Sequence, residues 1–268
     1  MRRLTSLAFS AALVSATGWP AAAQAAQAVP AAAASPRLEG AARFADSVQR
    51  LVETARLTAS FELLAEARAL AERALAVYPD DALLLLYQGY ALTQEVGVRL
   101  GRRGGDTGPL LEAAEQALER SVERRPTPEG HALLASVYGM KIGSNPLRGM
   151  TLGPRSGRAM ERALELGPDN PRVFLARGIG AINTPAMFGG GLDRAQEFLL
   201  RATRLFEQDQ PVPPAPAWGR ADAYAWLGQV YRRQNRVDQA RAAFDRALAL
   251  EPENRWYQQL RAALDRDH

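Results

Sequence analysis

Small and apolar residues recur at helical spacing along most of this sequence. The clearest pattern lies in residues 221–254, where two helix faces are marked first by Tyr224, Leu227, Gly228 and Tyr231 and then by Ala240, Phe244 and Ala247. Pro252 follows, and a proline cannot continue a helix. No segment alternates polar and apolar residues over the length of a strand, and the abundant Ala, Leu, Arg and Glu are good helix formers. The sequence therefore predicts an all-α protein.

The order and spacing of residues 221–254 resemble a tetratricopeptide repeat (TPR), a helix–turn–helix unit of about 34 residues. Gly228 and Ala240 are small where the two helices of such a unit cross, and Tyr231 and Phe244 fill the space beside them. Tyr224 stands where the family usually has Trp. One hairpin cannot bury its own apolar face, so it needs stacked neighbours. The resemblance implies a right-handed α-solenoid of about five TPR-like hairpins over residues 38–268.

Weaker copies of the unit precede this repeat. Further prolines close predicted second helices at Pro79, Pro126 and Pro168, and first helices are predicted at 85–89, 131–138 and 174–181. In the last of these, Arg177 stands where the repeat pattern has Leu. A fifth hairpin at 195–206 ends in a Pro-rich linker, 208–216. After the last repeat, the helical spacing of Trp256, Leu260 and Leu264 predicts a capping helix.

Three consecutive units have extra residues between their first and second helices. The insertions are 96–108, 141–155 and 183–191, and all contain helix-breaking Gly or Pro. In a stacked solenoid such turns fall along one edge, so we expect three neighbouring long loops, which in compact domains are usually functional or disordered. In the third insertion, Met187 and Phe188 either fold back onto the hairpin, with Asp193 capping the next helix, or form an apolar contact patch with Met150.

The predicted loop edge also carries an excess of positive charge. Its candidate partner-binding residues are Arg102, Arg103, Lys141, Arg148 and Phe188, with Arg99 and Arg155 nearby and only Glu95 and Asp106 against them. Arginine forks suit carboxylates and phosphates, which indicates an anionic partner. Ordinary solvated loop charge is the alternative interpretation.

The TPR resemblance also implies a concave groove lined by the first helices. Matching the repeat position by position places Tyr90, Ser136, Met140, Ile179, Gln229, Arg232 and Arg233 in it. This groove would be largely apolar in its earlier units and basic in its last unit. The resemblance therefore implies a protein or peptide partner with a hydrophobic run and an acidic segment.

The N-terminus predicts export. Arg2 and Arg3 precede a short apolar run, and small residues follow, which is typical of a cleavable signal peptide, here 1–25. Residues 26–37 form a predicted flexible Ala/Pro leader. The chain has no Cys, so a lipid anchor on an N-terminal Cys is not expected. We expect a periplasmic or secreted protein with no membrane span after signal removal.

Charge and residue content argue against several function classes. The net charge is only +4, and Lys141 is the only lysine, so no basic face for nucleic acid is indicated. With two His and no Cys, neither a His/Cys metal site nor a cofactor is expected. Glu112, Glu115 and Glu119 read as a solvated helix face. The sequence therefore predicts a non-catalytic protein–protein interaction scaffold of the cell envelope. The alternative is a periplasmic small-molecule-binding component associated with a transporter.

Overall fold

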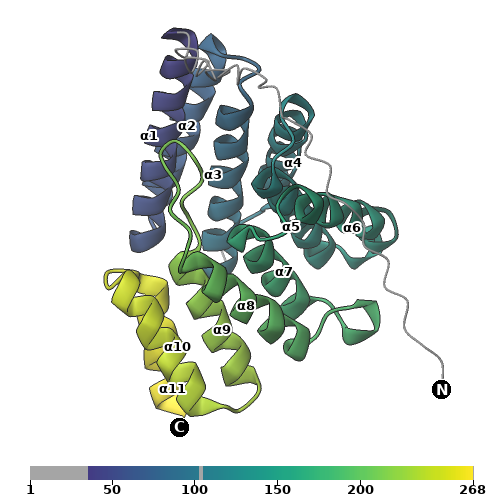
Figure 1. The fold of residues 1–268 in the computed structure, drawn as a ribbon, viewed down its shortest axis with the longest axis vertical. Coiled ribbons are helices and arrows are strands. Elements are labelled where there is room, and N and C mark those ends of the chain that lie inside the picture. Colours follow the sequence, from purple (N-terminus) through teal and green to yellow (C-terminus); the bar gives the residue numbers. More distant parts are fainter. Residues whose placement is uncertain (1–35, 103–104, 268) are drawn as a thin grey trace, which may run out of the picture. The chain divides into compact units, whose positions relative to one another are not determined.

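The computed structural model describes residues 36–102 and 105–267. In this part of the chain the regular structure is helical, and Figure 1 shows helices following one another as antiparallel pairs. The α-helices are α1 (Pro36–Thr58), α2 (Phe61–Val77), α3 (Ala82–Gly101), α4 (Gly108–Arg124), α5 (Pro128–Ser144), α6 (Gly149–Leu166), α7 (Pro171–Asn183), α8 (Leu192–Phe206), α9 (Arg220–Arg233), α10 (Val237–Leu250) and α11 (Arg255–Asp267). Helices α1 to α10 form five hairpins, and α11 packs on the last one. The predicted α-solenoid of about five hairpins with a final helix is confirmed.

Local sequence signals set the helix boundaries. The side chains of Ser60, Asp81, Thr127 and Asn170 accept hydrogen bonds from backbone N–H groups in the first turns of α2, α3, α5 and α7, which otherwise lack partners. Helices α2, α4, α6 and α10 each end two residues before a proline. A proline disfavours helical conformation in the residue before it, so these sites stop the second helices. The prediction that Asp193 caps α8 is wrong, because Gly191 occupies the N-cap and Asp193 lies inside the helix.

Glycines allow the two helices of a hairpin to approach closely. A Cβ atom added to Gly228 would lie 2.5 Å from the Phe244 ring, and one added to Gly178 would lie 2.6 Å from Leu199. In the hairpin of α3 and α4, a Cβ on Gly89 would lie 2.5 Å from Leu118. Carbon atoms do not approach each other so closely, so the small residue is needed at each crossing.

Two of the three predicted long loops are wrong, because the extra residues mainly lengthen helices. Helix α3 continues to Gly101, α5 continues to Ser144, and α6 begins at Gly149. Buried Val96 and Leu152 within these extensions show why helix is preferred, since a helical glycine costs only about 1 kcal/mol. Residues 183–191 do form a connection, with a 3₁₀ turn, η2, at Ala186–Phe188. A similar turn, η1, spans Pro146–Arg148 before α6.

A buried ion cluster connects the first helix to the last hairpin. On α1, the Arg56 guanidinium lies 2.7 Å from Asp222 of α9 and 3.2 Å from Glu251, which directly follows α10. Tyr257 of α11 donates to Asp222 at 2.7 Å, and its ring is fully buried. Helix α11 packs against α1 as well. Burial raises the pKa of Glu251 despite the opposing charge of Arg56.

Candidate functional site

The linker between α8 and α9 lies on the first helices of the first two hairpins, as the green loop in front of α1 and α3 in Figure 1 shows. Trp218 at the end of this linker stacks on Tyr90 of α3 with ring centroids 4.1 Å apart, and it meets Tyr87 edge-on at 6.0 Å. Only 7% of Trp218 is exposed. Such aromatic pairs contribute about 0.5–1.5 kcal/mol beyond the area they bury.

Polar contacts hold the same linker along its length. The Tyr87 hydroxyl donates to the carbonyl of Pro214 at 2.7 Å. Gln49 of α1 accepts from the backbone N–H of Ala217 at 2.9 Å. The sequence predicted a Pro-rich connection here, but not that it would cover first-helix residues of α1 and α3. Prolines have no backbone N–H group and cannot continue a helix, so carbonyl groups of this segment, such as that of Pro214, are left to accept from neighbouring side chains.

This arrangement removes one predicted groove residue from the surface. Tyr90 is 1% exposed, lies under Trp218 and donates to Glu53 at 2.8 Å, so the prediction that it contacts a partner is wrong. The other predicted groove residues keep part of their surface, and they are Ser136, Met140, Ile179, Gln229, Arg232 and Arg233. Met140 and Ile179 pack against the core.

Most predicted cations of the loop edge have acidic partners. Lys141 is 4% exposed and pairs with Glu112 at 2.7 Å and with Glu115, so it is not the surface contact that the sequence predicted. Burial opposes its charge, but hydrogen bonds to the two carboxylates outweigh burial and raise the Lys141 pKa. Helix α5 continues through Lys141 instead of opening into a loop.

The neighbouring arginines are also engaged. Arg148 pairs with Glu112 at 3.2 Å, while Arg155 pairs with Glu115 at 3.1 Å and with Glu119. Arg102 donates to the carbonyl of Ala59 at 2.7 Å and lies over the Phe61 ring, whereas Arg103 lies outside the described residues. The glutamates of α4 therefore do not form a simple solvated face. They neutralise the cations that the sequence placed on loops.

Exposed apolar residues remain on two connections. Leu147 on η1 and Met150 at the start of α6 are 87% and 91% exposed, and Met187 and Phe188 on η2 are 83% and 73% exposed. We call these four residues the apolar edge. Met187 and Phe188 do not fold back onto the hairpin, so that predicted interpretation is wrong. Both turns join the first to the second helix of consecutive hairpins, which places them at the same edge of the stack.

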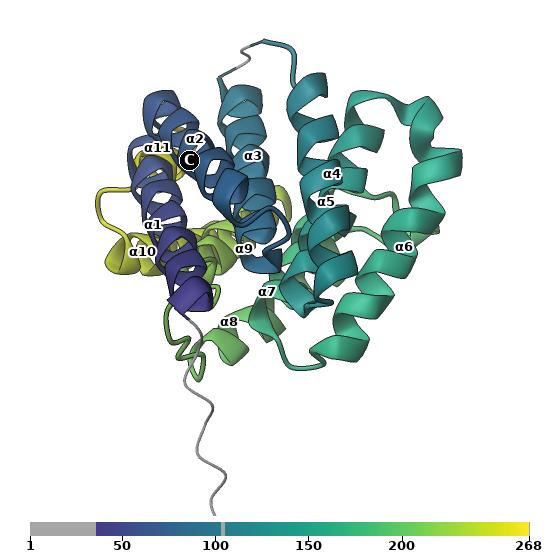
Figure 2. The same cartoon turned by 90° about the horizontal axis from the view of Figure 1, so that it is seen from above.

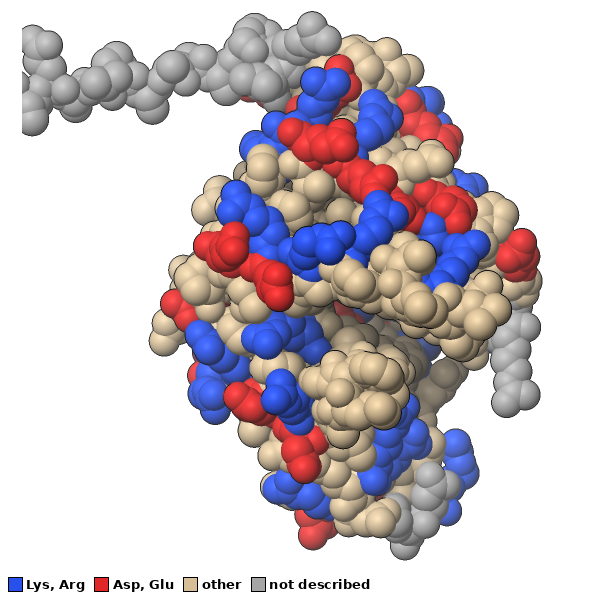
Figure 3. All heavy atoms as spheres, turned by 90° about the vertical axis from the view of Figure 1, so that its right-hand side faces the viewer, with Lys and Arg blue, Asp and Glu red and all other residues tan. Residues whose placement is uncertain are grey.

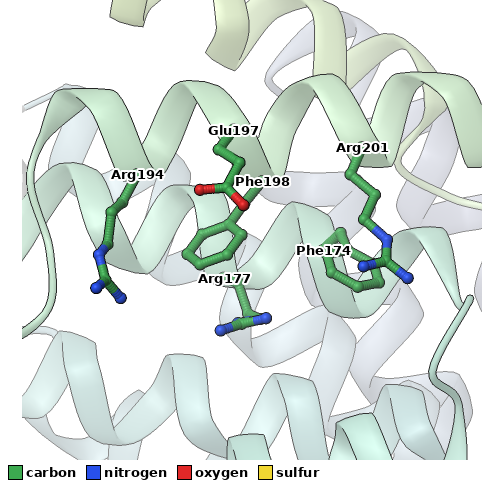
Figure 4. A pocket seen from close by; sticks show the side chains of 6 residues that line it. All are labelled: Phe174, Arg177, Arg194, Glu197, Phe198 and Arg201. Carbon is green, nitrogen blue, oxygen red and sulfur yellow. The ribbon is translucent and has the colours of Figure 1, made fainter.

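Figure 3 shows a hollow with Lys and Arg side chains at its border. Helices α7 and α8 carry a cleft of about 380 Å³, which we call the arginine cleft (Figure 4). Its lining residues are Phe174, Arg177, Arg194, Glu197, Phe198 and Arg201. Arg177 lies over the Phe198 ring at 4.0 Å, and Arg201 lies over Phe174 at 4.2 Å.

Sequence reasoning missed the arginine cleft, although one signal was present. Arg177 replaces the Leu of the repeat pattern, and it does so in the hairpin whose second helix carries Arg194 and Arg201. These residues are distant enough in sequence that their convergence depends on how α7 and α8 pack. The substitution of an apolar repeat position by arginine was the observation that could have led to it.

His131 lies beside a second depression, between α5 and α6. It borders Tyr138, Arg158 and Arg162 and is half-buried, as its predicted helix-packing position implies. Burial lowers the His131 pKa, and the charge of Arg162 lowers it further. No group of three or more His, Cys, Asp or Glu side chains suited to a metal ion occurs among the described residues. Within the same residues, no helix combines the length and apolar character needed to cross a bilayer.

Comparison with known proteins identifies the repeat. Residues 221–254 match the tetratricopeptide repeat family. The fold resembles TTC0263, a thermophilic TPR protein of Thermus thermophilus, with 20% identity, a TM-score of 0.57 and coverage of 81% of this chain and 98% of that one. It also resembles the HusA haemophore from Porphyromonas gingivalis, with 26% identity, a TM-score of 0.58 and coverage of 71% and 94%. Among curated proteins the sequence has no significant match.

These likenesses agree with the geometry of the hairpins. Residues 221–254 form a tetratricopeptide repeat, and the preceding helices repeat the same close crossing of first and second helix. Repeats of this kind stack into extended surfaces that bind other proteins or peptides. The fold is therefore a TPR-like α-solenoid.

Proposed function

We propose that this protein is an exported, non-catalytic scaffold of the cell envelope that holds another protein or peptide at its apolar edge. The observation that carries the proposal is the contrast between two surfaces. The linker covers part of the first-helix face, whereas Leu147, Met150, Met187 and Phe188 are at least 73% exposed. Apolar side chains presented on neighbouring turns are typical of a contact surface, and methionines adapt to a partner's shape.

Site-specific photo-crosslinking tests this proposal. We would place p-benzoylphenylalanine at Phe188 and, as a matched control, at Val212 of the linker, which is also 77% exposed. In the native cell, we expect a discrete crosslinked protein from position 188 and none from position 212. Crosslinking that is equal at both positions, or absent at 188, would refute the apolar edge as the contact surface.

Export is tested separately. We expect the protein in the periplasmic or secreted fraction, with a mass that corresponds to cleavage near Gln24 or Ala26, in the predicted signal region outside the described residues. If the protein keeps its N-terminal residues and is found in the cytoplasm, the proposed envelope location is refuted. The crosslinking result would still decide whether the apolar edge binds a partner.

The likeness to the HusA haemophore favours a second candidate function, the binding of a haem-like small molecule. The arginine cleft combines cations with two Phe rings, which could receive an anionic planar ligand. Titration with haemin, followed by visible absorbance and thermal unfolding, tests this candidate. A ligand at 100 times its Kd stabilises a protein by about 2.7 kcal/mol, so an unchanged melting temperature would exclude it.

A further inference from the structure

The core is thin between the third and fourth hairpins. One hydrophobic cluster lies mainly on α1 to α6, and a second lies on α7 to α11. Between them, Ala132, Ala163 and Val173 form a small separate cluster. Arg177 follows Val173 by one helical turn on α7, so it lies beside this small cluster. Its side chain is half-buried.

The arginine cleft at this place carries unbalanced positive charge. Arg201 is held by Asp169 at 3.0 Å. Arg177 and Arg194 have no hydrogen bond or ion pair within the described residues, and Glu197 is the one acidic residue of the lining. Figure 4 shows Arg194 and Arg201 reaching down from α8 on either side of Phe198, with Arg177 below the ring.

Arg177 differs from seven other buried or half-buried arginines. These seven pair with carboxylates, and they are Arg56, Arg68, Arg99, Arg155, Arg172, Arg241 and Arg261. Arg177 instead contacts the rings of Phe198 and Phe174. Burial lowers its pKa, with Glu197 acting against this effect and Arg194 and Arg201 adding to it. The negative charge of a carboxylate placed in the cleft would offset both the cost of desolvation and the repulsion between the arginines.

We propose that the arginine cleft binds an acidic side chain of a partner peptide, with an adjacent apolar side chain resting on Phe198. The fork of Arg177 can bind a carboxylate through two parallel hydrogen bonds, and the rings favour an apolar neighbour. The cleft volume of about 380 Å³ has room for side chains but not for a folded segment. This inference rests on the proposed function, since it assigns contact chemistry to the peptide that the scaffold holds.

Peptide binding measured by fluorescence anisotropy tests the proposal. The probes are two rhodamine-labelled peptides, Gly-Ser-Glu-Phe-Glu-Ser-Gly and its counterpart with Gln in place of both Glu. We expect the Glu peptide to bind the mature chain and the Gln peptide to bind at least about tenfold more weakly, because a charge-assisted bidentate contact is lost. Arg177→Gln should weaken binding of the Glu peptide by a similar factor, and Arg177→Lys should weaken its binding less.

Arg255→Gln is the matched control, because it removes one exposed positive charge from α11. Its affinity should equal that of the native chain, and circular dichroism should show every variant folded. Three outcomes would overturn the proposal: no measurable binding of the Glu peptide, equal affinity for both peptides, or equal effects of the Arg177 and Arg255 variants. Competition by free glutarate at the peptide's own concentration would overturn the peptide assignment. Crosslinking at position 188 is measured independently, so failure of the scaffold proposal is distinguishable.

Discussion

Gly178 and Gly180 lie two residues apart on α7, yet their surroundings are opposite. A Cβ on Gly178 would meet Leu199 at 2.6 Å, whereas a Cβ on exposed Gly180 would meet nothing within 4 Å. The first glycine is required by the crossing of α7 with α8. Gly180 has no such role, and its effect is to give the unfolded chain more conformational entropy than another residue would.

We therefore expect opposite effects of the same substitution. Gly178→Ala should destabilise the fold by about 1–3 kcal/mol, because Leu199 must leave its place in a packed core. Gly180→Ala should stabilise it by about 0.5–1 kcal/mol, because alanine favours helix. Urea denaturation followed by circular dichroism measures both values. Equal effects would show that the α7–α8 crossing is not as close as the structure has it.

His131 makes stability depend on pH. Its pKa is lowered in the folded state by burial and by Arg162, so the unfolded chain takes up a proton first as the pH falls. The free energy of unfolding should therefore include the whole contribution of His131 above about pH 6.5, and it should decrease as the pH drops below that value. Equilibrium unfolding between pH 7.5 and 5.5, at about half-unit steps, measures this slope.

The chain has one other histidine, His268, which serves as the control. His131→Gln should abolish the slope near pH 6.5, and His268→Gln should leave it unchanged. A slope that persists in the His131 variant would mean that another group causes it.

At the scale of elements, the linker behaves as part of the core. Trp218 is 7% exposed and contacts two tyrosines of α3, although it lies outside any helix. Trp218→Ala should reduce stability by about 3–5 kcal/mol, since a large buried ring is removed and a cavity is left. Val212→Ala, on the exposed part of the same linker, should change stability by less than about 0.5 kcal/mol. Thermal or urea unfolding of both variants gives the comparison.

If the Trp218 variant unfolds like the native chain, the linker does not pack on α3 in solution. Sequence reasoning found this segment but assigned it no contact, because prolines end the helical periodicity on which the prediction depended. The same limit affected the insertions at 96–108 and 141–155. Their glycines indicated loops, yet apolar residues such as Val96 and Leu152 kept them helical.

At the scale of the whole molecule, charges find partners between elements distant in sequence. Arg56 of α1 pairs with Asp222 and Glu251 near the other end of the chain, and Arg172 of α7 pairs with Asp209 of the linker at 2.7 Å. Burial of such pairs costs desolvation, which only good geometry and several hydrogen bonds offset. Among these engaged cations, the unpaired Arg177 is therefore informative about binding.

The sequence alone determined the repeating hairpins, the proline-marked ends of their second helices and the final helix, because small residues and prolines act on neighbouring residues and are readable in order. It also grouped Phe188 with Met150 and Met187 as a contact patch; all three are exposed, and their role in binding stays a prediction. Only the tertiary structure decided that Tyr90 is covered, that Lys141 is neutralised and that Arg177 has no acidic partner among residues 36–102 and 105–267. Those outcomes depend on which side chains from distant elements come within a few ångströms, and periodicity carries no information about such contacts.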